Sequence, residues 1–156
     1  MPKSDLEGKT VMIAQGSGNR QVSCNGELFS SLKSTLEQKG ATVVLSKHSP
    51  MELQSVPLIA EEVARHEPKI DALIVHNSDL TRTESGNVAV NLVKQLNNTL
   101  PVIVHDWNDT VNFEAIKSIR GGGGKYVNFN PPYDRIAFAV SDAIAQSTTT
   151  RRAVGV

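Results

Sequence analysis

Short apolar runs alternate with longer amphipathic stretches along the chain. Each run is nearly continuous in β-branched or aliphatic residues, which is typical of strands buried on both faces of a parallel sheet. Five runs have this character: Thr10–Ala14, Ala41–Leu45, Ala72–Val75, Val102–Val104 and Lys125–Phe129. They predict five strands.

The stretches between and after these runs carry apolar residues three and four positions apart, the spacing that places them on one face of a helix. Glycine, asparagine or proline follows several of the stretches, where helices commonly end. The predicted helices are Gly26–Lys39, Pro57–His66, Gly86–Asn97, Asn112–Arg120 and Asp134–Gln146.

This order of elements predicts an α/β fold. Parallel neighbours need a crossover connection, and right-handed crossovers place helices on both faces of the sheet. We therefore predict a three-layer α/β/α sandwich around a five-stranded parallel sheet, flavodoxin-like or Rossmann-like, with strand order 2-1-3-4-5. A single (βα)5 domain would span 9–146, preceded by a flexible flank at 1–8 and followed by a tail or linker at 147–156.

Composition narrows the classes of partner. The 156 residues are 39% hydrophobic and 21% charged, enough to bury the core of one domain. Sixteen Lys and Arg balance sixteen Asp and Glu, which argues against bulk-charge binding to nucleic acid or membrane. No apolar run is long enough for a membrane span or a signal peptide, and a single cysteine, Cys24, fits a reducing compartment. We therefore expect a cytoplasmic protein.

The loop after the first predicted strand is one candidate site, because ligands of such folds bind beyond the carboxyl ends of the strands. It contains Gly16, Ser17, Gly18, Asn19 and Arg20. Backbone N–H groups of a glycine-rich loop can face an anion, which an arginine can neutralise. The third glycine of a dinucleotide motif is replaced by Gln21, so a flexible surface turn is the alternative.

A second polar group follows the third and fourth predicted strands. It consists of His76, Asn77, His105, Asp106 and Trp107. On neighbouring strands these residues would line a cleft, where acid–base chemistry or metal binding is conceivable. No ligand pair has a local spacing that would fix a metal, so no metal site is predicted. Trp107 could stack on a planar ligand, anchor a protein partner or fold over the sheet edge.

Three segments resemble the receiver domains of bacterial response regulators. Ile70–Val75 is similar to the third strand of that family, Leu100–Val104 to its fourth, and Phe113–Pro132 to its passage from helix 4 to strand 5. All five βα units stand in the family's order. The resemblance implies a flavodoxin-like fold, a role in signal transduction and contact with a protein partner or a neighbouring domain.

The same resemblance places unusual residues at the family's functional positions. Gln15 and Gly16 stand where receivers hold paired metal-binding acids, and His76 stands at the phospho-acceptor aspartate. The hydroxyl position after the fourth strand of receivers falls on His105 or Asp106, and the lysine position of the fifth strand falls on Asn130 or Phe129. Without the acids Mg²⁺ lacks oxygen ligands, and without the aspartate no acyl phosphate forms. The resemblance thus implies a pseudo-receiver.

A second resemblance is to short-chain dehydrogenases/reductases. Leu6–Ile13 with the following glycines, Gly40–Leu45, Ile59–Val75 and Gly122–Asn128 are similar to four segments of that family. It implies a Rossmann-like, ketoreductase-like domain that takes NAD(P) or another phosphate-bearing ligand at 16–20. The family's catalytic serine is missing, and its Tyr-x-x-x-Lys pair is broken because Ala137 follows Tyr133 at the lysine position.

This sequence lacks the catalytic groups of both families, so no catalytic residue is assigned. The leading hypothesis is a non-catalytic regulatory or scaffolding domain that acts by protein–protein contact, with homo-oligomerisation left open. Its surface would be the strand-end loops or the face formed by 112–120, 125–129 and 134–146. The alternative is a degenerate reductase-like domain that binds a nucleotide or phosphate at 16–20. An enzyme of unknown class also stays open, because the cleft histidines and Asp106 suffice for acid–base chemistry.

Overall fold

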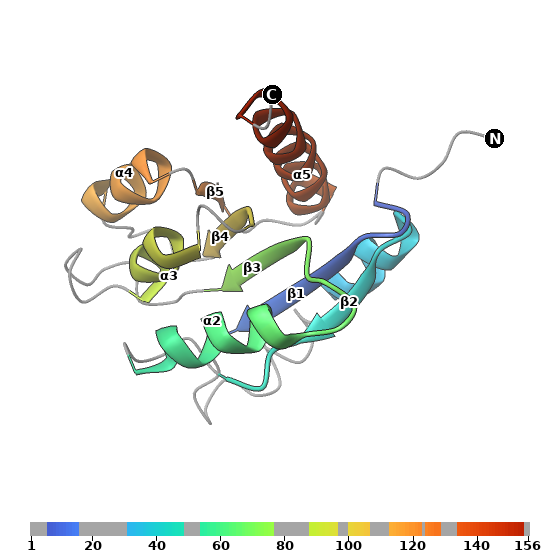
Figure 1. Ribbon diagram of the computed structural model, residues 1–156, viewed down its shortest axis with the longest axis horizontal. Helices are drawn as coiled ribbons and strands as arrows, with labels where there is room; N and C mark the ends of the chain where they lie inside the picture. The colour runs from blue at the N-terminus through green and yellow to red at the C-terminus, as the bar shows by residue number, and fades with distance from the viewer. Residues whose placement is uncertain are drawn as a thin grey trace.

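A computed structural model describes residues 6–15, 31–48, 54–76, 88–96, 100–106, 113–122, 124–128 and 134–154. Strands and helices alternate along these ranges (Figure 1). The elements are β1 (Thr10–Gln15), β2 (Thr42–Leu45), α2 (Ser55–Arg65), β3 (Ala72–His76), α3 (Val88–Leu96), β4 (Val102–Asp106), α4 (Phe113–Gly121), β5 (Lys125–Asn128) and α5 (Asp134–Val154). Residues 31–38 form a further helical segment before β2.

The strands form one five-stranded sheet in the order β2-β1-β3-β4-β5. Every pair of neighbours is parallel. Strands β1, β3 and β4 therefore lie in the interior of the sheet, and β2 and β5 form its edges (Figure 1). This arrangement confirms the predicted α/β class, the parallel sheet and the 2-1-3-4-5 order.

Each central strand buries side chains on both faces of the sheet. One set packs with α2, α3 and Ile119 of α4, and its strand members are Met12, Ala14, Leu73, Val75, Val102 and Val104. The alternate set packs with residues 31–38 and α5, and its strand members are Val11, Ile13, Ala72, Ile74 and Ile103. Because successive residues of a strand face opposite sides, this alternation produces the predicted three-layer sandwich.

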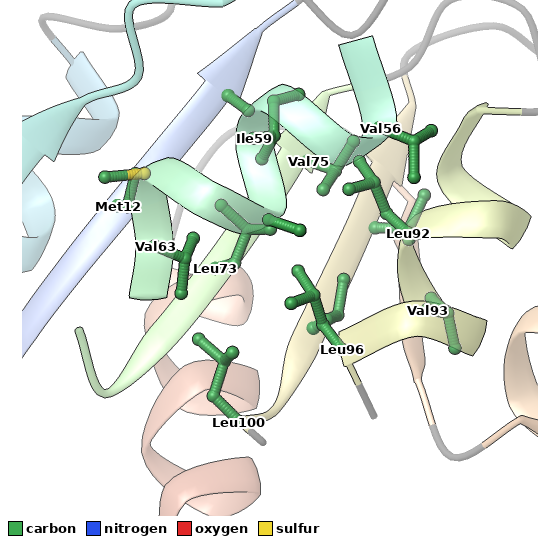
Figure 2. Packing of buried hydrophobic residues seen from close by; sticks show 14 of the residues in the cluster. Met12, Val56, Ile59, Val63, Leu73, Val75, Leu92, Val93, Leu96 and Leu100 are labelled. Carbon is green, nitrogen blue, oxygen red and sulfur yellow. The ribbon is translucent and has the colours of Figure 1, made fainter. Parts of the chain in front are cut away.

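Amphipathic helices cover the first of these faces. Helix α2 buries Val56, Ile59, Ala60 and Val63, which recur at the spacing of a helical stripe. Figure 2 shows α2 and α3 side by side over the sheet, with Leu92 of α3 beside Val56 of α2. The apolar periodicity of the sequence thus predicted both helices. On α2 it identified Ile59 and Val63 of the buried stripe, whereas Leu58 is 46% exposed and Val56, before the predicted start at Pro57, is buried.

The predicted end of the last helix was wrong. Helix α5 continues to Val154, whereas the sequence pattern predicted an end at Gln146. The division into a domain at 9–146 and a tail or linker at 147–156 stays a prediction. The predicted helix end relied on the loss of apolar periodicity, but serine, threonine and arginine cost a helix only modest free energy. No glycine or proline occurs between Asp134 and Val154, so no strong helix breaker interrupts this segment. Gly155 comes next in the sequence, and glycine commonly follows the end of a helix.

Leu6, near the end of the flank predicted at 1–8, packs into the core, while residues 1–5 lie outside the described residues. Leu6 is 1% exposed and belongs to the cluster under α5 and residues 31–38. Its N–H donates to the carbonyl of Lys39 at 3.1 Å. Gly40 has a φ of +98°, and a Cβ there would lie 2.8 Å from the Glu7 Cα. Glycine thus allows residues 6–8 to pack closely beside the turn before β2.

Some residues of the predicted elements, at 26–30, 86–87, 97, 112 and 129, lie outside the described residues. Within the described ranges, none of the helices combines the length and the apolar character needed to cross a bilayer.

Candidate functional site

The carboxyl ends of the three central strands bring together three polar positions. In the register of the sheet, Gln15 of β1 pairs with His76 of β3, and His76 pairs with His105 of β4. We call these three positions the carboxyl-end row. Neighbouring strands lie about 4.8 Å apart, so the row is a compact set even though its members are far apart in the sequence.

All three positions of the row belong to one face of the sheet. Each follows a residue of the cluster under α2 and α3, namely Ala14, Val75 and Val104. Because strand residues alternate between faces, the row falls on the opposite side, the side covered by α5 and residues 31–38. Asp106 comes one position later on β4 and pairs in register with Asn128 of β5.

The residue types in the row determine what it can bind. It offers one amide and two imidazoles and has no carboxylate. Mg²⁺ requires oxygen ligands and usually uses carboxylates, so the row does not suit that ion. Among the described residues, no group of three or more His, Cys, Asp or Glu is placed to hold a metal.

The other predicted site residues lie outside the described residues. These are Gly16, Ser17, Gly18, Asn19, Arg20, Asn77 and Trp107. A phosphate-binding role for 16–20 and a ligand or partner contact at Trp107 therefore remain predictions.

A polar cluster at the end of β2 was missed by the sequence reasoning. The Ser46 hydroxyl donates to Glu62 Oε1 at 2.5 Å, and the Lys47 N–H donates to Glu62 Oε2 at 2.9 Å. The His48 N–H in turn donates to Ser46 Oγ at 3.1 Å. Glu62 thus links α2 to the chain that leaves β2. No local sequence signal marks this contact, because Ser46 and Glu62 are separated by 16 positions.

Helix α5 carries an exposed aromatic residue, Phe138, four positions before Asp142 of an ion pair, so the two residues lie on one side of the helix. Phe138 on α5 is 73% exposed. On the same helix, Asp142 pairs with Lys125 of the edge strand β5 and accepts a hydrogen bond from Gln146 Nε2 at 3.2 Å. We refer to Phe138, Lys125, Asp142 and Gln146 as the α5–β5 face. It includes part of the surface that the sequence predicted for partner contact.

No protein-family model matches the sequence, and a search of the curated proteins finds no significant match.

Solved structures do match the fold. A two-component response regulator from Clostridium difficile superposes with a TM-score of 0.55 at 18% identity, over 88% of this chain and 96% of that chain. The Mn²⁺-bound form of response regulator Rcp1 superposes with a TM-score of 0.50 at 11% identity, over 86% of this chain and 90% of that chain. The chain has a receiver-like fold.

The receiver-like topology differs from that of a six-stranded dinucleotide-binding sheet. In the order 3-2-1-4-5-6 another strand lies outside the second one. Here β2 is an edge strand, and the described residues contain no strand beyond it. The topology thus gives no support to the resemblance to short-chain reductases, which stays a prediction.

Proposed function

We propose that this chain is a non-catalytic regulatory or scaffolding domain that acts by protein–protein contact and is not switched by aspartyl phosphorylation. The observation that carries the proposal is the residue at the end of β3. His76 occupies the middle position of the carboxyl-end row, where the resemblance to receivers would require the phospho-acceptor aspartate. An imidazole cannot form the acyl phosphate that a carboxylate forms.

The neighbours of His76 support the same proposal. Aspartyl phosphorylation in receivers needs a divalent cation held by acids at the end of the first strand. Here Gln15 ends β1, and its register partner is His76. An amide beside two imidazoles lacks the negative charge that attracts Mg²⁺, so we derive no phosphoryl-transfer step at this row.

We propose the α5–β5 face as the contact surface. Aromatic side chains are enriched among the residues that dominate binding free energy in interfaces. Phe138 exposes 73% of its surface, and the Lys125–Asp142 pair beside it would form part of a polar rim. The partner would be another protein, a neighbouring domain or a second copy of this chain.

Substitution of Phe138 tests this surface. We expect Phe138→Ala to weaken partner binding by at least about tenfold, the loss typical of a truncated interface anchor. The measurement is a titration of each partner that the wild-type chain captures, followed by sedimentation of the chain alone to detect self-association.

Leu58→Ala is the matched control, because Leu58 is an exposed apolar residue of α2 at 46% exposure. Both substitutions are at exposed positions and should change the free energy of unfolding by no more than about 0.5 kcal/mol. The proposed surface is rejected if Phe138→Ala and Phe138→Asp both leave partner affinity and self-association at wild-type values.

A further inference from the structure

Two of the four histidines of the chain come together only in the folded sheet. His76 and His105 are separated in sequence by α3 and the segments on either side of it, yet they are register partners on the adjacent parallel strands β3 and β4. Gln15 is the next register partner of His76, on β1. Spacing along the sequence alone therefore could not reveal this pairing.

The spacing of the two positions suits a shared metal ion. Register partners lie on the same face of a sheet, and neighbouring strands are about 4.8 Å apart. A transition-metal ion binds imidazole nitrogen at about 2.0–2.1 Å, so two ring nitrogens on one ion are no more than about 4 Å apart. Backbones at the strand separation can satisfy that requirement without a change of register.

Ligand chemistry selects the class of ion. Imidazole suits Zn²⁺, Cu²⁺ and Ni²⁺, whereas Mg²⁺ and Ca²⁺ prefer carboxylate, carbonyl and water oxygens. The row has two imidazoles and no carboxylate. An ion held by two histidines keeps open coordination positions for water or for a ligand from outside the chain.

We propose that the facing positions of His76 and His105 form a binding site for a divalent transition metal of the Zn²⁺, Cu²⁺ or Ni²⁺ class. The site is independent of the proposed contact function, because it requires neither a partner nor the α5–β5 face.

The remaining two histidines provide matched controls. His66 Nδ1 lies 2.8 Å from the Pro68 carbonyl oxygen. His48 follows β2, and its N–H donates to Ser46 Oγ. Both belong to connecting segments, and neither is a strand position. Each can be changed to asparagine without altering the carboxyl-end row.

The test is a ZnCl₂ titration of the untagged, metal-free full chain with ¹⁵N-labelled histidine side chains. The His48→Asn and His66→Asn variants assign their own imidazole signals, which leaves those of His76 and His105. We expect the latter two signals to shift together and saturate at one equivalent of Zn²⁺, and MgCl₂ to leave them unchanged. No shift, a shift restricted to His48 or His66, or an equal response to Mg²⁺ would overturn the proposal.

Calorimetry of variants provides a second measurement. Loss of a residue that only orients a metal ligand lowers metal affinity by about tenfold or more. Loss of a direct ligand should lower it at least as much, so we expect His76→Asn and His105→Asn each to weaken Zn²⁺ binding by about tenfold or more. The His48→Asn/His66→Asn double variant should keep wild-type affinity. Wild-type affinity in either row variant would overturn the proposal. If a row variant does not fold, the titration of the wild-type chain decides.

Discussion

Gly124, just before β5, lies where the packing leaves no room for a side chain. A Cβ at this position would lie 2.8 Å from Val93 Cγ2 and 3.1 Å from Ile119 Cγ2. The Gly124 N–H donates to the Ile119 carbonyl at 2.9 Å, which fixes the backbone against the end of α4. Val93 and Ile119 are both fully buried, and their β-branched side chains have little rotamer freedom.

Gly124→Ala should therefore destabilise the protein by about 1–3 kcal/mol, the usual cost of overpacking a core. Urea denaturation of the variant and the wild type measures this difference. Gly121→Ala is the control, because a Cβ at Gly121 meets nothing within 4 Å. That variant should be neutral or more stable by up to about 1 kcal/mol, since alanine favours the helix. Equal effects of the two substitutions would contradict the packing argument.

At the scale of elements, Glu62 connects α2 to the segment that leaves β2. Its two carboxylate oxygens accept from the Ser46 hydroxyl and the Lys47 N–H. Ser46 is only 9% exposed, so loss of its acceptor would leave a nearly buried hydroxyl without this hydrogen bond. The adjacent Glu61 instead forms an exposed pair with Arg65 at 2.8 Å.

We expect Glu62→Ala to cost about 1–3 kcal/mol, the range for leaving a buried polar group without its hydrogen-bond partner. Hydrogen exchange at the Lys47 amide should accelerate in the same variant. Glu61→Ala, which removes a surface pair one position away, should cost no more than about 1 kcal/mol and leave that amide protected. The proposed link is wrong if Glu62→Ala behaves like Glu61→Ala in both measurements.

The ends of elements show what a periodic pattern can and cannot predict. The strands were recognisable because residues such as Leu73 and Ile74 are apolar on both faces of the sheet, which only a covered parallel sheet requires. The residues of α5 after Gln146 have no apolar periodicity, so the sequence pattern could not predict that the helix continues to Val154. The burial of Leu6 depends on its contact with the turn at Lys39, far along the sequence.

At the scale of the whole molecule, the topology followed from the order of elements, because helical crossovers permit few arrangements of five parallel strands. That order also placed the ends of β3 and β4 side by side, as the sheet confirms. The register did not follow from it. Only the sheet shows that His76 and His105 are register partners, since a slip by one residue would pair different positions of the two strands.

The proposed function requires that this receiver-like fold works without a phosphorylated aspartate. The most direct test is intact mass spectrometry of the full chain after incubation with acetyl phosphate and Mg²⁺. With His76 at the end of β3 and Gln15 at the end of β1, we predict no mass increase beyond that of a magnesium-free control. A near-stoichiometric gain of one phosphoryl group that hydroxylamine removes, as it removes an acyl phosphate, would contradict the account.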